Sequence, residues 1–241
     1  QFDGALQMFK TAIKIKPDYA EAYFNIGVIF QEYGKHDEAI NSYKEALKLI
    51  PGYHDAHNNL GILLLDIGQL NDSVEHFEWA IAYKPDFAEA HNNLGSAMQK
   101  LEQLDAALNC YKKAISLKSD YSQAHNNIGI LFQKLGKVDS AQLSFELAIS
   151  HQPDNASAHH NLSTLKKYIV NDPQIAQMQS LISLNNLNKS DKIYLSFALA
   201  KASEDLGKKN EFIEFLDQGN RLRKEELDFS FDKSENDNVV I

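Results

Sequence analysis

The fold is decided by the segment His125-Asn126-Asn127-Ile128-Gly129, which is one copy of a recurring five-residue phrase. Close copies occupy residues 57–61 and 91–95, and weaker versions occupy 23–27 and 159–163. Each copy therefore begins 34 residues after the previous one. A fixed period of this length is typical of stacked supersecondary units. The sequence predicts a repeat protein whose units share one continuous core.

Each repeat is predicted to contain two helices joined by short turns. In residues 54–87 the apolar side chains of Leu60 and Leu64 follow the 3.6-residue period of a helix. In three repeats a glycine stands where the first helix should end, and glycine suits this position because it adopts a left-handed backbone at little cost. The third full repeat has Glu102 there instead. The glycines at this position are Gly34, Gly68 and Gly136. The fold class is therefore predicted to be all-α.

A second set of glycines lies inside the first helix of each repeat, at 27, 61, 95 and 129. Glycine inside a helix costs about 1 kcal/mol relative to alanine. Because this cost recurs in every repeat, we expect a packing reason for it. The second helix of each repeat is predicted to cross at the glycine too closely for a side chain.

The period also predicts how the chain is divided. Residues 1–19 form half a repeat, four full repeats occupy 20–155, and 156–189 form a degenerate repeat. A divergent helical hairpin is predicted at 190–227, with Ser190 capping its first helix and Gly207 ending it. Residues 228–241 are predicted to be a polar tail or, at Val239-Val240-Ile241, the first strand of another domain.

The repeats resemble the tetratricopeptide-repeat family. That family's pattern of a small residue, a large residue, alanine, an aromatic residue, alanine and proline is supplied in the second repeat by Gly61, Leu64, Ser73, Phe77, Ala80 and Pro85. Ser73 departs from the pattern where alanine is usual. The resemblance covers residues 1 to about 170. It implies a right-handed superhelical solenoid of helix-turn-helix repeats whose concave groove binds protein or peptide.

Asparagines form two columns in the first helices, and the family's geometry places the first column in the concave groove. The first column is Asn25, Asn59, Asn93, Asn127 and Asn161, and the second is Asn58, Asn92 and Asn126. A carboxamide both donates and accepts hydrogen bonds, so a row of them can pair with the backbone of an extended peptide. Repeats about 10 Å apart match about three extended residues. The alternative is that these side chains bond neighbouring helices or only keep the groove polar.

Two narrower resemblances give an alternative function. The phrase Ala-His-Asn-Asn-Leu-Gly is similar to the repeats of O-linked N-acetylglucosamine transferases, which use such an asparagine ladder. Residues 195–228, with Ala-Lys-Ala-Ser-Glu-Asp-Leu-Gly at 200–207 and Gly-Asn-Arg-Leu at 219–222, resemble the junction where bacterial repeats precede a sulfotransferase domain. The alternative is therefore the substrate-recruiting region of a larger transferase, sulfotransferase first and glycosyltransferase second, with its catalytic domain outside this chain.

Composition and motifs argue against several other functions. A net charge of -9 has the wrong sign for a nucleic-acid binder. No apolar run has the length of a membrane span, and no catalytic or cofactor motif occurs, so we expect no enzyme activity in this chain. The column of His57, His91, His125 and His159 is predicted to pack rather than bind metal, because successive members are too far apart for one ion.

The remaining expectations concern compartment and self-association. The single cysteine, Cys110, argues against an internal disulfide framework and favours a reducing, cytoplasmic location. The half repeat is expected to leave Phe2, Leu6 and Phe9 with less cover, because it lacks the first helix of a complete repeat. A homodimer through exposed terminal helices is therefore a third interpretation.

Overall fold

The computed structural model describes residues 2–184 and 186–236, with only the helical backbone described at 2 and 228–236. Within these residues the chain is all-α, with thirteen helices and no strand, so the predicted fold class is confirmed. The chain divides into two compact units, Gln1–Ser119 and Asp120–Ile241. The helices of the first unit are α1 (Phe2–Ile15), α2 (Ala20–Glu32), α3 (His36–Leu49), α4 (His54–Asp66), α5 (Leu70–Tyr83), α6 (Ala88–Lys100) and α7 (Leu104–Leu117).

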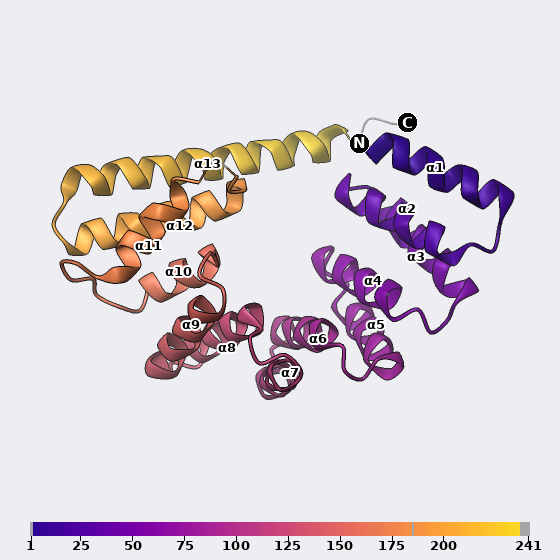
Figure 1. Ribbon diagram of the computed structural model, residues 1–241, viewed down its shortest axis with the longest axis horizontal. Helices are drawn as coiled ribbons and strands as arrows, with labels where there is room; N and C mark the ends of the chain where they lie inside the picture. The colour runs from indigo at the N-terminus through magenta and orange to yellow at the C-terminus, as the bar shows by residue number, and fades with distance from the viewer. Residues whose placement is uncertain (1, 185, 237–241) are drawn as a thin grey trace. The chain divides into compact units, whose positions relative to one another are not determined.

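The first unit is a stack of helical hairpins (Figure 1). Helices α2 and α3, α4 and α5, and α6 and α7 pack as pairs, and α3 with α4 and α5 with α6 join successive pairs. Each pair is one predicted repeat. The core between the first two pairs contains Tyr43, Leu60 and Leu63, all at most 1% exposed.

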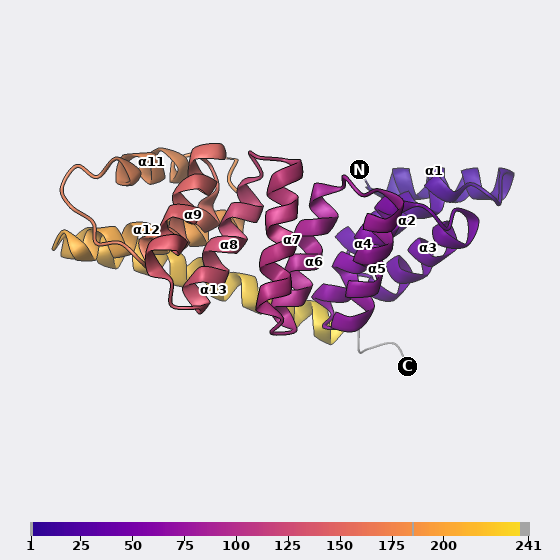
Figure 2. The same ribbon diagram turned by 90° about the horizontal axis from the view of Figure 1, so that it is seen from below.

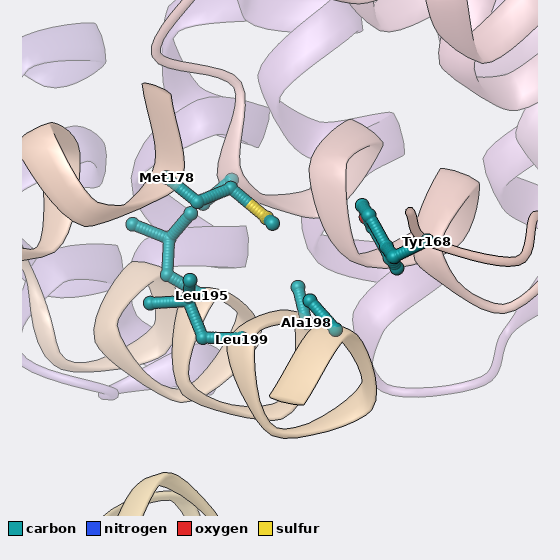
Figure 3. Packing of buried hydrophobic residues seen from close by; sticks show 7 residues of the cluster. Tyr168, Met178, Leu195, Ala198 and Leu199 are labelled. Carbon is teal, nitrogen blue, oxygen red and sulfur yellow. The ribbon is translucent and has the colours of Figure 1, made fainter. Parts of the chain in front are cut away.

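The second unit contains α8 (Ser122–Lys134), α9 (Val138–His151), α10 (Ala156–Ser163), α11 (Pro173–Ile182), α12 (Lys189–Asp205) and α13 (Lys209–Asn236). Helix α10 is only eight residues long, and a nine-residue connection separates it from α11. Helix α12 packs against α10, α11 and α13, and Figure 2 shows it alongside α13. Its Leu195, Ala198 and Leu199 pack with Met178 of α11 and with Tyr168 (Figure 3).

The glycines inside the first helices lie directly against an aromatic ring of the second helix. A Cβ atom on Gly61 would lie 2.7 Å from Phe77, and one on Gly95 would lie 2.6 Å from Tyr111. Gly27 faces Tyr43 and Gly129 faces Phe145 in the same way. The predicted reason for these glycines, a close helix crossing, is confirmed.

The predicted helix-ending positions adopt a left-handed backbone. Gly34, Gly68 and Gly136 have φ of +71°, +82° and +70°. Glu102 takes the same conformation with φ of +61°, although it carries a side chain. The third repeat therefore makes the same turn as the others, with strain that glycine would avoid.

The structure corrects the sequence interpretation near the last two helices. The N-cap of α12 is Asn188 rather than Ser190, because the Asn188 side chain accepts a hydrogen bond from the backbone N–H of Asp191 at 2.7 Å. Helix α13 continues to Asn236, beyond the predicted end at 227. Val239-Val240-Ile241 lies outside the described residues.

Helix α1 packs on α2 and has the partial cover that the half repeat predicted. Phe9 is half-buried, whereas Tyr43, its counterpart 34 residues later, is 0% exposed. Leu6 and its counterpart Ile40 are both half-buried, and the Phe2 side chain lies outside the described residues. The apolar Met8 and Ile15 are 73% and 81% exposed. A homodimer through this helix stays a prediction.

Candidate functional site

The two asparagine columns differ in burial. The first-column asparagines, at 25, 59, 93, 127 and 161, are all half-buried. In the second column, Asn58, Asn92 and Asn126 are only 2%, 0% and 6% exposed. The first column can therefore meet a ligand directly, whereas the second column lies beneath the surface.

Hydrogen bonds connect the columns from one repeat to the next inside each unit. In the first unit, Nδ2 of Asn93 on α6 donates to Oδ1 of Asn58 on α4 at 3.0 Å. In the second unit, Nδ2 of Asn161 on α10 donates to Oδ1 of Asn126 on α8, also at 3.0 Å. The second column thus orients the carboxamides of Asn93 and Asn161, so the alternative in which asparagines bond neighbouring helices is correct for these two contacts.

The first repeat lacks a second-column asparagine, because Phe24 occupies that position. Asn59 instead hydrogen-bonds the hydroxyl of Tyr43, which itself donates to Oε1 of Gln31 at 2.7 Å. Burial raises the pKa of Tyr43 to about 12, so the hydroxyl stays protonated. Asn25 donates to the backbone carbonyl of Glu21 in its own helix at 2.7 Å. These different partners leave each of the two carboxamides anchored.

An anchored carboxamide still has hydrogen-bonding capacity. An asparagine side chain carries two N–H groups and an oxygen with two lone pairs. Asn93 uses one N–H on Asn58 and accepts a long contact of 3.5 Å from Asn92. One N–H and one lone pair of the half-buried Asn93 side chain therefore stay available. A donor and an acceptor side by side match the alternating C=O and N–H groups of an extended backbone.

The histidine column has a structural role that the sequence did not reveal. Nε2 of His57, His91 and His159 donates to the backbone carbonyl of the proline six residues earlier, at 3.0, 3.1 and 2.9 Å. Those carbonyls follow the end of the preceding helix, where backbone acceptors lack helical partners. The constant spacing between each proline and the histidine was the signal that could have identified the bond.

His57 also belongs to an aromatic cluster with side chains of α5. Its Nδ1 lies 3.0 Å from Nδ1 of His76, and its ring stacks on Trp79 and Tyr83 with centroids 6.3 and 5.9 Å apart. Because Nε2 of His57 donates to a carbonyl, Nδ1 of the neutral ring must accept from His76. Burial lowers the pKa of both histidines, which favours this neutral pair.

Other candidate chemistry finds no support in the described part of the chain. Among the side chains that the structure describes, in residues 3–184 and 186–227, no three of His, Cys, Asp or Glu are placed to hold a metal ion. Burial raises the pKa of the Cys110 thiol, which disfavours the reactive thiolate. None of the described helices combines the length and apolar character needed to cross a bilayer.

Family models identify the repeats directly. A tetratricopeptide repeat model matches residues 20–53, another matches 122–155, and a TPR repeat model matches 1–34, 63–102 and 100–136. No curated protein matches the sequence. The narrower likenesses to O-linked N-acetylglucosamine transferases and to a sulfotransferase junction therefore stay predictions.

Solved structures share the fold. PilF of Pseudomonas aeruginosa is 18% identical with a TM-score of 0.67, covering 90% of this chain and 97% of PilF. The TPR protein YrrB is 20% identical with a TM-score of 0.56, covering 86% of this chain and 96% of YrrB. A MamA structure is 26% identical with a TM-score of 0.54, covering 78% of this chain and 94% of MamA. With repeat models matching residues 1–53 and 63–155, the chain belongs to the tetratricopeptide-repeat family.

Proposed function

We propose that this chain is a protein-interaction scaffold that binds an extended peptide segment through its first-column asparagines. The observation that carries the proposal is the pair of bonds from Asn93 to Asn58 and from Asn161 to Asn126, both 3.0 Å long. Each bond holds a half-exposed carboxamide in one orientation before any ligand arrives. A group held in place loses less conformational entropy on binding, which raises affinity.

The chemistry of the column favours recognition of backbone over side chains. A carboxamide that offers one N–H and one lone pair can pair with any residue's backbone, whatever its side chain. The ligand class is therefore an extended polypeptide with little sequence restriction at the ladder. YrrB, which shares the fold, is described as a TPR protein with an unusual peptide-binding site, and this supports the same class of ligand here.

The test begins by selecting peptides from a displayed library on the wild-type chain. Their affinities are then measured for the triple variant Asn59→Ala, Asn93→Ala, Asn127→Ala. The matched control replaces three exposed asparagines of the second helices, Asn41, Asn71 and Asn109, by alanine. We expect the ladder variant to lose binding and the control variant to keep it. Equal affinities for all three proteins would refute the ladder.

A second ligand separates backbone recognition from side-chain recognition. Methylating the backbone nitrogen at every third residue of a selected peptide removes N–H donors at the spacing of the ladder. We expect that analogue to bind at least tenfold more weakly, because buried acceptors lose their partners. Helical circular dichroism of each variant, recorded at the binding temperature, shows whether lost binding reflects lost folding.

Recruitment of substrates for a transferase is retained as the alternative proposal. It rests on the resemblance of the asparagine phrase and of residues 195–228 to transferase-associated sequences. The test is the coding sequence that follows Ile241. A strand leading into a phosphate-binding loop would favour the transferase, and its absence would leave the scaffold alone.

A further inference from the structure

Two glutamines of the first unit are held in one orientation by buried tyrosines. Gln31, near the end of α2, and Gln99, near the end of α6, occupy the same position in the first and third repeats, and both side chains are half-buried. The Tyr43 hydroxyl donates to Oε1 of Gln31 at 2.7 Å. In the same way the Tyr111 hydroxyl donates to Oε1 of Gln99 at 3.0 Å.

The second and fourth repeats lack the tyrosine hydroxyl. The second repeat has Leu65 in place of the glutamine and Phe77 in place of the tyrosine. The fourth repeat pairs Gln133 with Phe145, and Nε2 of Gln133 donates instead to Oγ1 of Thr164 at 3.2 Å. The tyrosine hydroxyl thus accompanies a glutamine that has no other side chain to hold it.

The bond from tyrosine leaves the amide nitrogens of both glutamines available. Because Oε1 accepts from the buried hydroxyl, Nε2 lies on the other branch of the carboxamide. In the part of the chain that the structure describes, Nε2 of Gln31 and Nε2 of Gln99 donate no hydrogen bond. Neither nitrogen is closed off from solvent. Each glutamine therefore offers two N–H donors to a ligand.

Gln31 lies next to the asparagine ladder. The Tyr43 hydroxyl that holds Gln31 also hydrogen-bonds Asn59 of the next repeat, so one hydroxyl group separates the two carboxamides. A peptide bound by Asn59 would pass within reach of Gln31. The Glu32 carboxylate also lies near this hydroxyl and would repel an anionic acceptor. The acceptor that suits Gln31 is therefore a neutral carbonyl.

We propose that Gln31 and Gln99 are further peptide contacts, each donating from Nε2 to a backbone carbonyl of the partner segment. This inference rests on the proposed function, since it needs the same extended partner. Tyr43 and Tyr111 are then positioning residues. Two repeats of about 10 Å each separate the glutamines, which matches about six extended residues. Leu65, in the repeat between them, offers no donor, so the extra contacts fix the register of the partner segment.

The test uses peptides selected on the wild-type chain. Gln31→Glu with Gln99→Glu keeps an acceptor for each tyrosine but removes the N–H donors. We expect the affinity of this variant to be lower by about tenfold or more. The control, Gln7→Glu with Gln103→Glu, adds the same two charges at exposed positions and should bind as the wild type does. Equal affinities of the first variant and the wild type would overturn the proposal.

A second set of variants separates orientation of the glutamines from packing. Tyr43→Phe with Tyr111→Phe removes only the hydroxyls, and the fully buried Phe77 shows that phenylalanine fits this position. We expect binding to weaken about threefold. The same changes should cause no further loss in a Gln31→Leu, Gln99→Leu protein. A further loss in that background would show that the tyrosines act on the fold, and helical circular dichroism identifies any variant that fails to fold.

The triple asparagine variant separates this inference from the proposed function. Lost binding in the triple asparagine variant, with full binding by the Gln31→Glu, Gln99→Glu variant, would overturn the glutamine contacts and leave the ladder. Full binding by the triple asparagine variant would refute the ladder. Weak binding by the glutamine variant would in that case still assign the two glutamines as contacts.

Discussion

The carboxamide of Asn93 donates a hydrogen bond to that of Asn58 at 3.0 Å, across a sequence separation of 35 residues. Asn93 is half-buried, whereas Asn58 is 2% exposed and donates from its own Nδ2 to Oε1 of Glu89 at 3.4 Å. Buried Asn58 thus orients half-exposed Asn93, and the two belong to the second and first asparagine columns of successive repeats. This relationship gives neighbouring asparagines different roles.

Removing the Asn93–Asn58 bond should reveal a coupling between the two side chains. In a double-mutant cycle of Asn58→Ala and Asn93→Ala, we expect a coupling in the free energy of unfolding of about 0.5–1.5 kcal/mol. Urea denaturation of the four proteins measures it. Asn25→Ala provides the control, because Asn25 bonds its own helix and should combine additively with Asn58→Ala. Additive effects in both cycles would mean that the Asn93–Asn58 bond contributes nothing.

Replacing Gly95 even by alanine should destabilise the protein. Gly95→Ala places a Cβ atom 2.6 Å from Cε1 of Tyr111, so we expect a loss of about 1–3 kcal/mol in the free energy of unfolding. Gly95→Leu should be worse. The control is Gly4→Ala in α1, where a Cβ atom would meet nothing within 4 Å and the higher helix propensity of alanine should stabilise slightly. Similar changes at both positions would contradict the packing argument.

Glu102 holds a left-handed backbone with φ of +61°. Because that conformation costs a residue with a side chain about 1–2 kcal/mol, Glu102→Gly should raise the free energy of unfolding by about 1 kcal/mol. The matched change Glu78→Gly, at an exposed position inside α5, should instead lower it by a similar amount. Thermal unfolding of the two variants measures both signs. A loss of stability in Glu102→Gly would show that its side-chain interactions outweigh the strain.

Stability should fall as the pH drops below about 6.5, the ordinary value for histidine. Burial lowers the pKa of His57, His76 and His159, so the unfolded chain takes up protons that the folded chain resists. Folding stability is therefore full above about pH 7 and declines from about 6.5 down to the lowered pKa values. Urea midpoints at several pH values check this decline.

The substitution His76→Gln should reduce the pH dependence, because glutamine can still donate to Nδ1 of His57 but does not titrate. Trp79 is the single tryptophan of the chain and stacks on His57 at 6.3 Å. Its fluorescence should therefore change with a midpoint below about pH 6.5 in the wild type. An unchanged pH profile in His76→Gln would exclude this pair as a contributor.

Much of the fold could be predicted because the same pattern of residues recurs in every repeat. The glycine at 61 and the aromatic residue at 77 recur together, and a helix crossing is the simplest cause of both. The asparagine columns were also visible, but their difference in burial was not. The family's geometry placed the first column in the groove, but the burial of the second column depends on how one repeat is rotated on the next, and the period alone does not contain that angle.

The less regular region was predicted less well. Ser190 and Asn188 are both good N-cap residues, and only the backbone shows that α12 begins at Lys189. The hydrogen bond between Gln174 and His159 could not be predicted, because the two residues meet across a connection that departs from the repeat. Irregular segments bring together residues whose spacing carries no signal.

The contact between each internal glycine and its aromatic ring sets the distance between the two helices of a hairpin. In the pairs Gly27–Tyr43, Gly61–Phe77 and Gly95–Tyr111, the thickness of one ring sets how closely the two helices approach. Because the hairpins are stacked, a thicker or thinner ring would also change the distance between successive first-column asparagines. We therefore expect that altering the rings at 77 or 111 would change the spacing of the first-column asparagines without substituting any residue proposed to contact a peptide.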